Sequence, residues 1–217
     1  MLDLEGLLLN CNRDIHRPAV SVSDVVISVY DAEKGTFSVV SDEICAGNAE
    51  SDRPSAFGEN LSELHKLLME KFPNCRTLVL GQSDGCREWA ECGEALPPLT
   101  LQYAEYFLGE VYNTGHFEDW NARTAADMIA RLFRHKKPEH VPAAFIPSVG
   151  VITWGNETAQ AVKQLLVLEE SCHLALRLRK LVKSCFIYLP PELLYEEYYR
   201  HQNLGPSPIQ RGNADME

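Results

Sequence analysis

The sequence contains no run of apolar residues close to the roughly 18 that a membrane-spanning helix needs. It is also short of positive charge, with 20 basic residues against 31 acidic ones and a net charge of −11. This excess of negative charge disfavours non-specific binding to nucleic acids or anionic membranes. It would also repel a phosphorylated substrate unless a local basic site overrode it. We therefore predict a chain that binds neither nucleic acid nor a membrane.

Motifs of known chemistry are scarce as well. The sequence has no glycine-rich phosphate loop, and Ser148 lies in Pro-Ser-Val-Gly, which lacks the Gly-x-Ser-x-Gly of a nucleophile elbow. The seven cysteines are odd in number, and the closest pair, Cys86 and Cys92, does not have a zinc-knuckle spacing. The first ten residues lack the basic start of a secretory leader. We therefore interpret the cysteines as reduced thiols and expect a cytoplasmic protein.

The composition is that of an ordinary globular domain. The chain has 217 residues, of which 45% are hydrophobic, and this is enough to bury one sizeable core. We predict one domain over residues 1–204. Residues 205–217 (GPSPIQRGNADME) are polar and contain glycine and proline, which predicts a disordered tail.

Short runs rich in β-branched residues predict strands. The first two runs, residues 25–30 and 36–40, are joined by a link that ends in Gly35 and suits a hairpin. The other predicted strands are residues 77–80, 143–146 and 151–153.

Apolar residues at helical spacing and capping signals predict the helices. Asn60 is expected to begin one helix, with Glu63 completing a capping box, and Asn156 to cap a long helix that ends near Lys183. Residues 41–59, before Asn60, are predicted to form a loop. The remaining predicted helices are residues 2–11, 100–108, 122–133 and 189–199. Because strands and helices mix without a strict βαβ repeat, we predict a single α/β domain with a mixed central sheet.

Three segments resemble the class II aldolase/adducin family. Residues 141–155 (VPAAFIPSVGVITWG) resemble its strand-turn-strand, which reads approximately VPAVLVHSHGPFAWG, and residues 161–170 (AVKQLLVLEE) resemble the following helix. Residues 189–205 resemble the C-terminus of its L-ribulose-5-phosphate 4-epimerase branch. The resemblance covers roughly residues 1–210. It implies a three-layer α/β/α domain with a central mixed, mainly antiparallel sheet, and a cyclic tetramer with active sites between subunits.

The enzymes of this family hold a divalent metal, usually zinc, with three histidines, and the metal stabilises an enediolate. The resemblance places the first two ligand positions at Leu80 and Gln82 and the third at Pro147. The other histidine of the turn matches Val149, and Leu61 stands where the family has an acidic residue near the metal. Leucine and proline have no ligating group, and glutamine is a weak ligand for zinc. We therefore expect neither a metal nor another cofactor.

The other site positions of the family are altered as well. Its phosphate-binding turns match residues 25–26 (VV), 40–43 (VSDE) and 59–60 (EN), whose apolar and acidic groups would obstruct or repel a phosphate. The acid/base carboxylate of the epimerase branch matches Glu105, which becomes the candidate catalytic residue. The tyrosine of that branch falls near residues 207–208 (SP), where no phenol is present.

Two further groups have alternative interpretations. Glu169 and His173, four residues apart on a predicted helix, either face one metal ion or form a surface pair. Cys86, close to the former metal position, is either a small apolar filler or a reactive thiol.

The resemblance leads to two main hypotheses. In the first, the chain is a non-catalytic family member that acts by binding or assembly, for which the adducin head domains are a precedent. It would form a homo-oligomer, a tetramer by resemblance, or a hetero-oligomer with an active paralogue. In the second, it is a diverged sugar-phosphate epimerase or aldolase of carbohydrate metabolism that retains Glu105. A third possibility is a small non-phosphorylated ligand in the family's cleft.

Overall fold

The computed structural model describes residues 25–41, 56–72, 74–116, 121–181 and 188–205, together with Gly6, Ser207 and Pro208. The predicted helix over residues 2–11 and most of the predicted tail lie outside these residues. The division into a domain over residues 1–204 and a disordered tail therefore stays a prediction.

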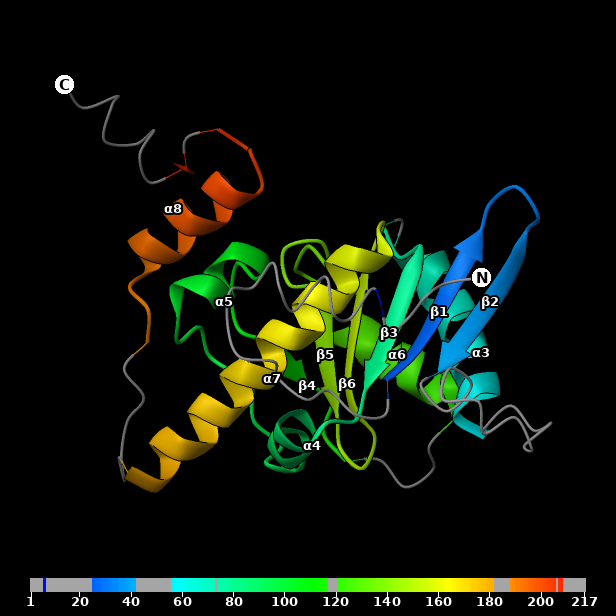
Figure 1. Ribbon diagram of the computed structural model, residues 1–217, viewed down its shortest axis with the longest axis horizontal. Coiled ribbons are helices and arrows are strands. Elements are labelled where there is room, and N and C mark those ends of the chain that lie inside the picture. The colour runs from blue at the N-terminus through cyan, green and yellow to red at the C-terminus, as the bar shows by residue number, and fades with distance from the viewer. Residues whose placement is uncertain are drawn as a thin grey trace.

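Six strands form one sheet within the described residues (Figure 1), in the order β2-β1-β3-β6-β5-β4. All neighbouring pairs are antiparallel except β4 and β5, which are parallel. This confirms the central mixed, mainly antiparallel sheet. The strands are β1 (Val25–Asp31), β2 (Thr36–Ser41), β3 (Thr77–Gly81), β4 (Tyr112–Asn113), β5 (Ala143–Ile146) and β6 (Gly150–Gly155).

Helices cover both faces of the sheet and complete the predicted three layers (Figure 1). On one face lie α3 (Ala56–Lys71) and α6 (Ala122–Leu132). On the other lie α4 (Asp84–Glu91), α5 (Leu101–Tyr106) and the long helix α7 (Thr158–Leu181). The last helix, α8 (Pro191–His201), packs against α5 at the margin of the domain. Within the described ranges, none of the helices combines the length and the apolar character that crossing a membrane requires.

The starts of α3 and α7 differ from the predicted caps. Helix α3 begins at Ala56, so Asn60 lies inside it and the predicted capping box with Glu63 is wrong. Alanine and glutamate favour helix, and the turn containing Ala56 and Glu59 extends α3 before Asn60. Helix α7 begins at Thr158, two residues after the Asn156 that was predicted to cap it.

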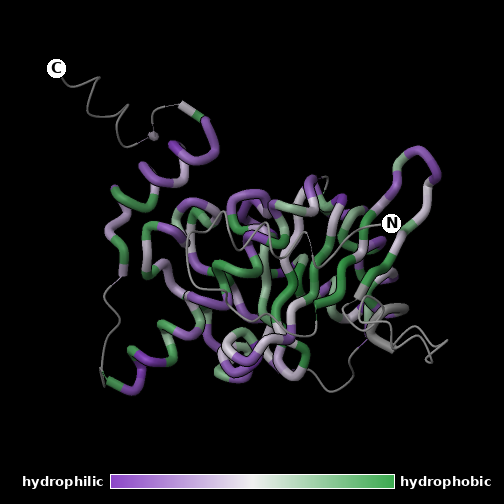
Figure 2. The backbone as a smooth tube through the Cα atoms, in the orientation of Figure 1, coloured by the Kyte–Doolittle hydropathy of each residue, from purple (hydrophilic) through white to green (hydrophobic). Residues whose placement is uncertain are grey.

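Because helices cover both faces, the inner strands are buried on both faces. Every residue of β3, β5 and β6 is buried. Figure 2 shows the hydrophobic segments on the central strands and the hydrophilic ones on the β1–β2 loop. On the α3/α6 face, Trp154 stacks on Phe72 and meets Phe133 edge-on, each at 5.4 Å between ring centroids.

His65 ties α3 to the sheet. Its Nδ1 lies 2.9 Å from the Ser28 hydroxyl of β1, and its Nε2 lies 2.9 Å from the backbone carbonyl of Cys75. Since a carbonyl oxygen only accepts, Nε2 carries the proton and Nδ1 accepts the Ser28 O–H. The ring is fully buried, and this burial lowers the pKa of His65 below its usual value of 6.5.

We therefore expect acid to destabilise the protein partly through His65. Below pH 6.5 the unfolded chain binds a proton at this residue while the folded chain does not, so the free energy of unfolding falls as the pH falls towards the lower folded-state pKa. The substitution His65→Gln, which keeps a donor for the Cys75 carbonyl, should flatten this part of the stability profile. Urea denaturation at a series of pH values measures it, with the exposed His135→Gln as the matched control. An unchanged slope in His65→Gln would contradict the assignment.

Candidate functional site

The positions that the resemblance assigns to the family's metal site lie together at one edge of the sheet, the lower edge in Figure 1. Strand β3 ends there at Gly81, immediately before Gln82, and the turn between β5 and β6 contains Pro147 and Val149. The Gln82 Nε2 donates to the Val149 carbonyl at 2.9 Å, which joins the two segments directly. The fold thus brings these positions close together.

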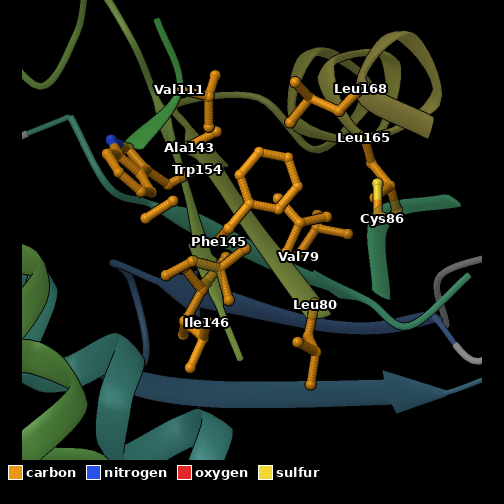
Figure 3. Close-up of a cluster of buried hydrophobic side chains, with 14 of the residues drawn as sticks. Val79, Leu80, Cys86, Val111, Ala143, Phe145, Ile146, Trp154, Leu165 and Leu168 are labelled. Carbon is orange, nitrogen blue, oxygen red and sulfur yellow. The ribbon is translucent and has the colours of Figure 1, made fainter. Parts of the chain in front are cut away.

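The side chains at this edge are packed and apolar. Leu80 is 1% exposed, Leu61 2% and Val149 3%, and Pro147 is also buried. In Figure 3, Leu80 and Ile146 point to one face of the sheet, and Val79 and Phe145 point to the other. No three His, Cys, Asp or Glu side chains of the described residues are close enough to hold a metal ion together. The residues at this edge do not fit the family's metal.

The first of the phosphate-binding turns, at residues 25–26, is equally closed. Val25 and Val26 begin β1 at the same edge, paired with Gly81 and Leu80 of β3, and both valines are buried. Their side chains occupy the interior, where a doubly charged phosphate would lose its hydration. Residues 42–43 of the second turn lie outside the described residues.

Glu105 lies on α5, away from this edge in the same chain (Figure 1). Its side chain is one-third exposed, and its Oε2 lies 3.6 Å from the Nδ1 of His201 on α8. Its backbone carbonyl accepts a hydrogen bond from the Gln202 side chain. The structure therefore places Glu105 in the contact between α5 and α8, and brings none of the metal-site positions of the same chain to it.

Glu169 and His173 are in contact, but the surface-pair interpretation does not describe Glu169, which is 1% exposed. One carboxylate oxygen accepts from the Gly85 backbone at 2.9 Å and lies 2.9 Å from the His173 Nε2. The other accepts from the Ser83 hydroxyl and from the Cys86 backbone at 2.8 Å. Glu169 therefore caps the N-terminus of α4 from the neighbouring helix α7, with two contacts at each oxygen.

Cys86 faces Cys172 of α7, and both thiols are buried. Burial raises the pKa of the Cys86 thiol well above its usual value and also raises that of Cys172. A thiol held in its neutral form is a poor nucleophile and a poor metal ligand. The geometry thus favours the interpretation of Cys86 as a small apolar filler.

The class II aldolase and adducin N-terminal domain family has a model that matches residues 22–176. The chain belongs to this family. Over 116 residues it is 25% identical to the L-ribulose-5-phosphate 4-epimerases UlaF of Salmonella paratyphi B and Salmonella typhi, and the match covers 51% of this chain and 51% of each relative. The chain thus spans about half the length of the curated relatives that it matches.

Solved structures of the family share the fold at lower identity. The aldolase/epimerase/decarboxylase-like protein YgbL of Escherichia coli superposes with a TM-score of 0.61 at 18% identity, over 89% of this chain and 96% of YgbL. An L-fuculose 1-phosphate aldolase gives a TM-score of 0.63 at 12% identity, over 91% and 95% of the two chains. At these identities the likeness shows the fold alone.

Sequence reasoning missed the capping role of Glu169, although it had selected this residue. The local signal was present, because Ser83 precedes the first turn of α4 and Gly85 lies within that turn. A Cβ on Gly85 would lie 2.9 Å from the Glu169 Oε1, so glycine is what allows the carboxylate to approach. The approach of α7 to α4 is a tertiary contact, which the spacing within α7 does not encode.

Proposed function

We propose that this chain is a non-catalytic member of the class II aldolase/adducin family that acts by binding or assembly. The observation that supports the proposal is the replacement of the family's metal positions by a packed apolar edge. Leu80 and Pro147 occupy two of the three ligand positions and offer no donor atom. At the third, Gln82 donates its amide N–H to the Val149 backbone.

The family reaction depends on a cation that polarises a carbonyl and stabilises the enediolate. Such charge stabilisation requires dipoles or cations aimed at the developing oxyanion. Leu61, Leu80 and Val149 supply neither, and as buried side chains they leave little space for a sugar phosphate. Close packing of apolar side chains stabilises this edge as part of the core, and it also leaves neither polar groups nor space for catalysis.

An assembly role is supported by apolar side chains on the outer surface of the α5–α8 pair. Leu101 at the start of α5 is 47% exposed, and Leu193 on α8 is 42% exposed. Covering such residues in a subunit interface would remove apolar area from water. We propose a homo-oligomer, a tetramer by family resemblance, or a hetero-oligomer with an active paralogue. We further propose that it works in the cytoplasm, without nucleic-acid or membrane partners.

The test is the metal content of protein purified without a chelator, with the molar mass measured by light scattering on the same sample. We expect less than about a tenth of an equivalent of zinc, manganese, iron or cobalt per chain, since a full structural or catalytic site would retain close to one. The mass should correspond to an oligomer. A metal content near one equivalent per chain would overturn the proposal.

The alternative is a diverged sugar-phosphate epimerase or aldolase of carbohydrate metabolism. The match to the UlaF epimerases and the carboxylate of Glu105 favour it. It predicts metal-dependent turnover of L-ribulose 5-phosphate or L-fuculose 1-phosphate, lost in Glu105→Gln and kept in Glu110→Gln. No turnover by the wild-type oligomer, with or without added zinc, would exclude these two reactions.

A further inference from the structure

A polar cavity outside the family's site lies at the opposite edge of the sheet, the upper edge in Figure 1. Strands β3 and β5 begin there and β6 ends there, next to the N-terminal turns of α7 and the C-terminal end of α8. The cavity has a volume of about 270 Å³. Its lining includes His140 and the carboxamides of Asn74, Asn156, Gln160, Gln164 and Gln202.

The polar lining consists mainly of carboxamides. Five asparagine and glutamine side chains contribute to it, and neither lysine nor arginine does. A carboxamide offers two N–H donors and a carbonyl acceptor without net charge. His140 adds an imidazole whose pKa is lowered by burial, so that it too is neutral at neutral pH. A phosphate or carboxylate would find no cationic partner among these residues.

Gln164 supplies the strongest sign that the cavity has an occupant. Its side chain is only 1% exposed, and its Oε1 has no hydrogen-bond partner among the described residues. Leaving a buried carbonyl oxygen without a donor costs the free energy of its lost hydration. A residue of this kind on the cavity wall is expected where a ligand or an ordered water supplies the missing donor.

Other polar groups of the wall are held in place by the protein. The Tyr198 hydroxyl donates to the Glu139 carbonyl, and the Gln202 Nε2 donates to the Glu105 carbonyl. The His140 and Tyr198 rings meet edge-on at 5.9 Å between centroids. These contacts join the α8 region to the segment before β5 and to α5, so the cavity is largely preformed, which lowers the entropic cost of binding.

We propose that this cavity binds a small uncharged polyhydroxylated molecule of the size of a free monosaccharide. A hydroxyl group both donates and accepts, and this matches carboxamides better than an anion or an apolar ligand would. The volume lies slightly below the roughly 300–1,000 Å³ of drug-sized sites, which suits a compact metabolite. The proposal goes beyond the proposed function and does not depend on whether the opposite edge is catalytic.

The experiment is ligand-observed NMR on the full chain with D-ribose, L-arabinose, D-glucose and glycerol. D-ribose 5-phosphate and D-glucose 6-phosphate serve as charged comparators. We expect saturable binding of at least one uncharged compound with a Kd of about 1 mM or below. In Gln164→Met, which keeps the shape of the side chain but removes its carbonyl and amide groups, binding should weaken at least about tenfold. The matched control is Gln102→Met, a half-buried glutamine of α5 outside the cavity.

The melting temperature of Gln164→Met gives a second readout, because this substitution removes the buried Gln164 Oε1 that lacks a hydrogen-bond partner among the described residues. The empty Gln164→Met protein should melt at the same temperature as the wild type or higher. If Gln164→Met fails to fold, Gln160→Met tests ligand binding at another carboxamide of the same cavity. The proposal is overturned if none of the uncharged compounds binds at about 10 mM. It is also overturned if only the phosphorylated sugars bind, or if binding survives unchanged in both cavity variants.

Discussion

Glu169→Ala is expected to lower the free energy of unfolding by about 3–5 kcal/mol, because each buried donor left without its acceptor costs about 1–3 kcal/mol. The substitution leaves the Gly85 and Cys86 backbone N–H groups and the Ser83 hydroxyl without their acceptor. It also removes the negative charge from the N-terminus of α4, where the helix dipole favours it. Helix α4 has only eight residues, so it depends on this contact with α7.

Urea denaturation measures the effect, and Glu88→Ala is the matched control, because Glu88 is an exposed glutamate in the middle of the same helix. The control should change the free energy of unfolding by less than about 0.5 kcal/mol. Glu169→Gln tests the charge separately, since its NH₂ group would face N–H donors and lose at least one hydrogen bond. A loss of stability below about 1 kcal/mol in Glu169→Ala would show that α4 does not rely on the carboxylate.

The role of Glu169 also bears on function. A metal ion bound between Glu169 and His173 would have to displace the Gly85 backbone N–H from the carboxylate oxygen that faces His173. The helix cap explains the burial of the carboxylate without any ligand. This removes one of the few candidates for a replacement metal centre and leaves the cavity at the opposite edge as the binding site that we propose.

Much of the fold follows from local sequence patterns. The β-branched run at residues 25–30 and the glycine that ends the link to the next strand predict the β1–β2 hairpin, and Gly35 indeed has a left-handed φ of +65°. Buried strands such as β5 have no polar face, because helices cover both sides of the sheet. A short run of apolar residues without polar alternation is the sequence pattern that predicts such a strand. The family resemblance then supplied the layers that local patterns do not specify.

The remaining features depend on contacts between distant segments. Strand β4 has two residues, too few for a pattern, and exists because it pairs with β5. Separate segments around Asn74, His140, Gln160 and Gln202 form the wall of the cavity, so no single stretch of sequence predicts it. The burial of Gln164 could not be predicted from the sequence for the same reason. A glutamine on a long helix is normally exposed, and the neighbouring elements decide whether it is buried.

Gly150→Ala is expected to lower the free energy of unfolding by about 4 kcal/mol or more, or to prevent folding, because the new methyl group has no space. Gly150 begins β6 with a φ of +128°, a conformation that favours glycine. A Cβ there would lie 2.3 Å from the Gly81 carbonyl oxygen and 3.3 Å from the Gln82 Cα. Both contacts are with backbone atoms, so no side-chain rotation relieves them.

The matched control is Gly35→Ala, where φ is also positive but no atom lies within 4 Å of the new Cβ. That substitution should cost about 1–2 kcal/mol, the strain of a left-handed alanine alone. Urea denaturation and the yield of folded protein distinguish the two variants, and equal losses would contradict the close approach at Gly150. The contact that excludes a methyl group joins β6 to the end of β3, beside Gln82 and Val149. The family turn also has glycine at this position, so a strong effect at Gly150 would establish the close approach of β6 to β3 and not the loss of a metal site. What distinguishes this chain at the edge is the apolar side chains of Leu80, Pro147 and Val149, which leave little space for a hydrated metal and a sugar phosphate.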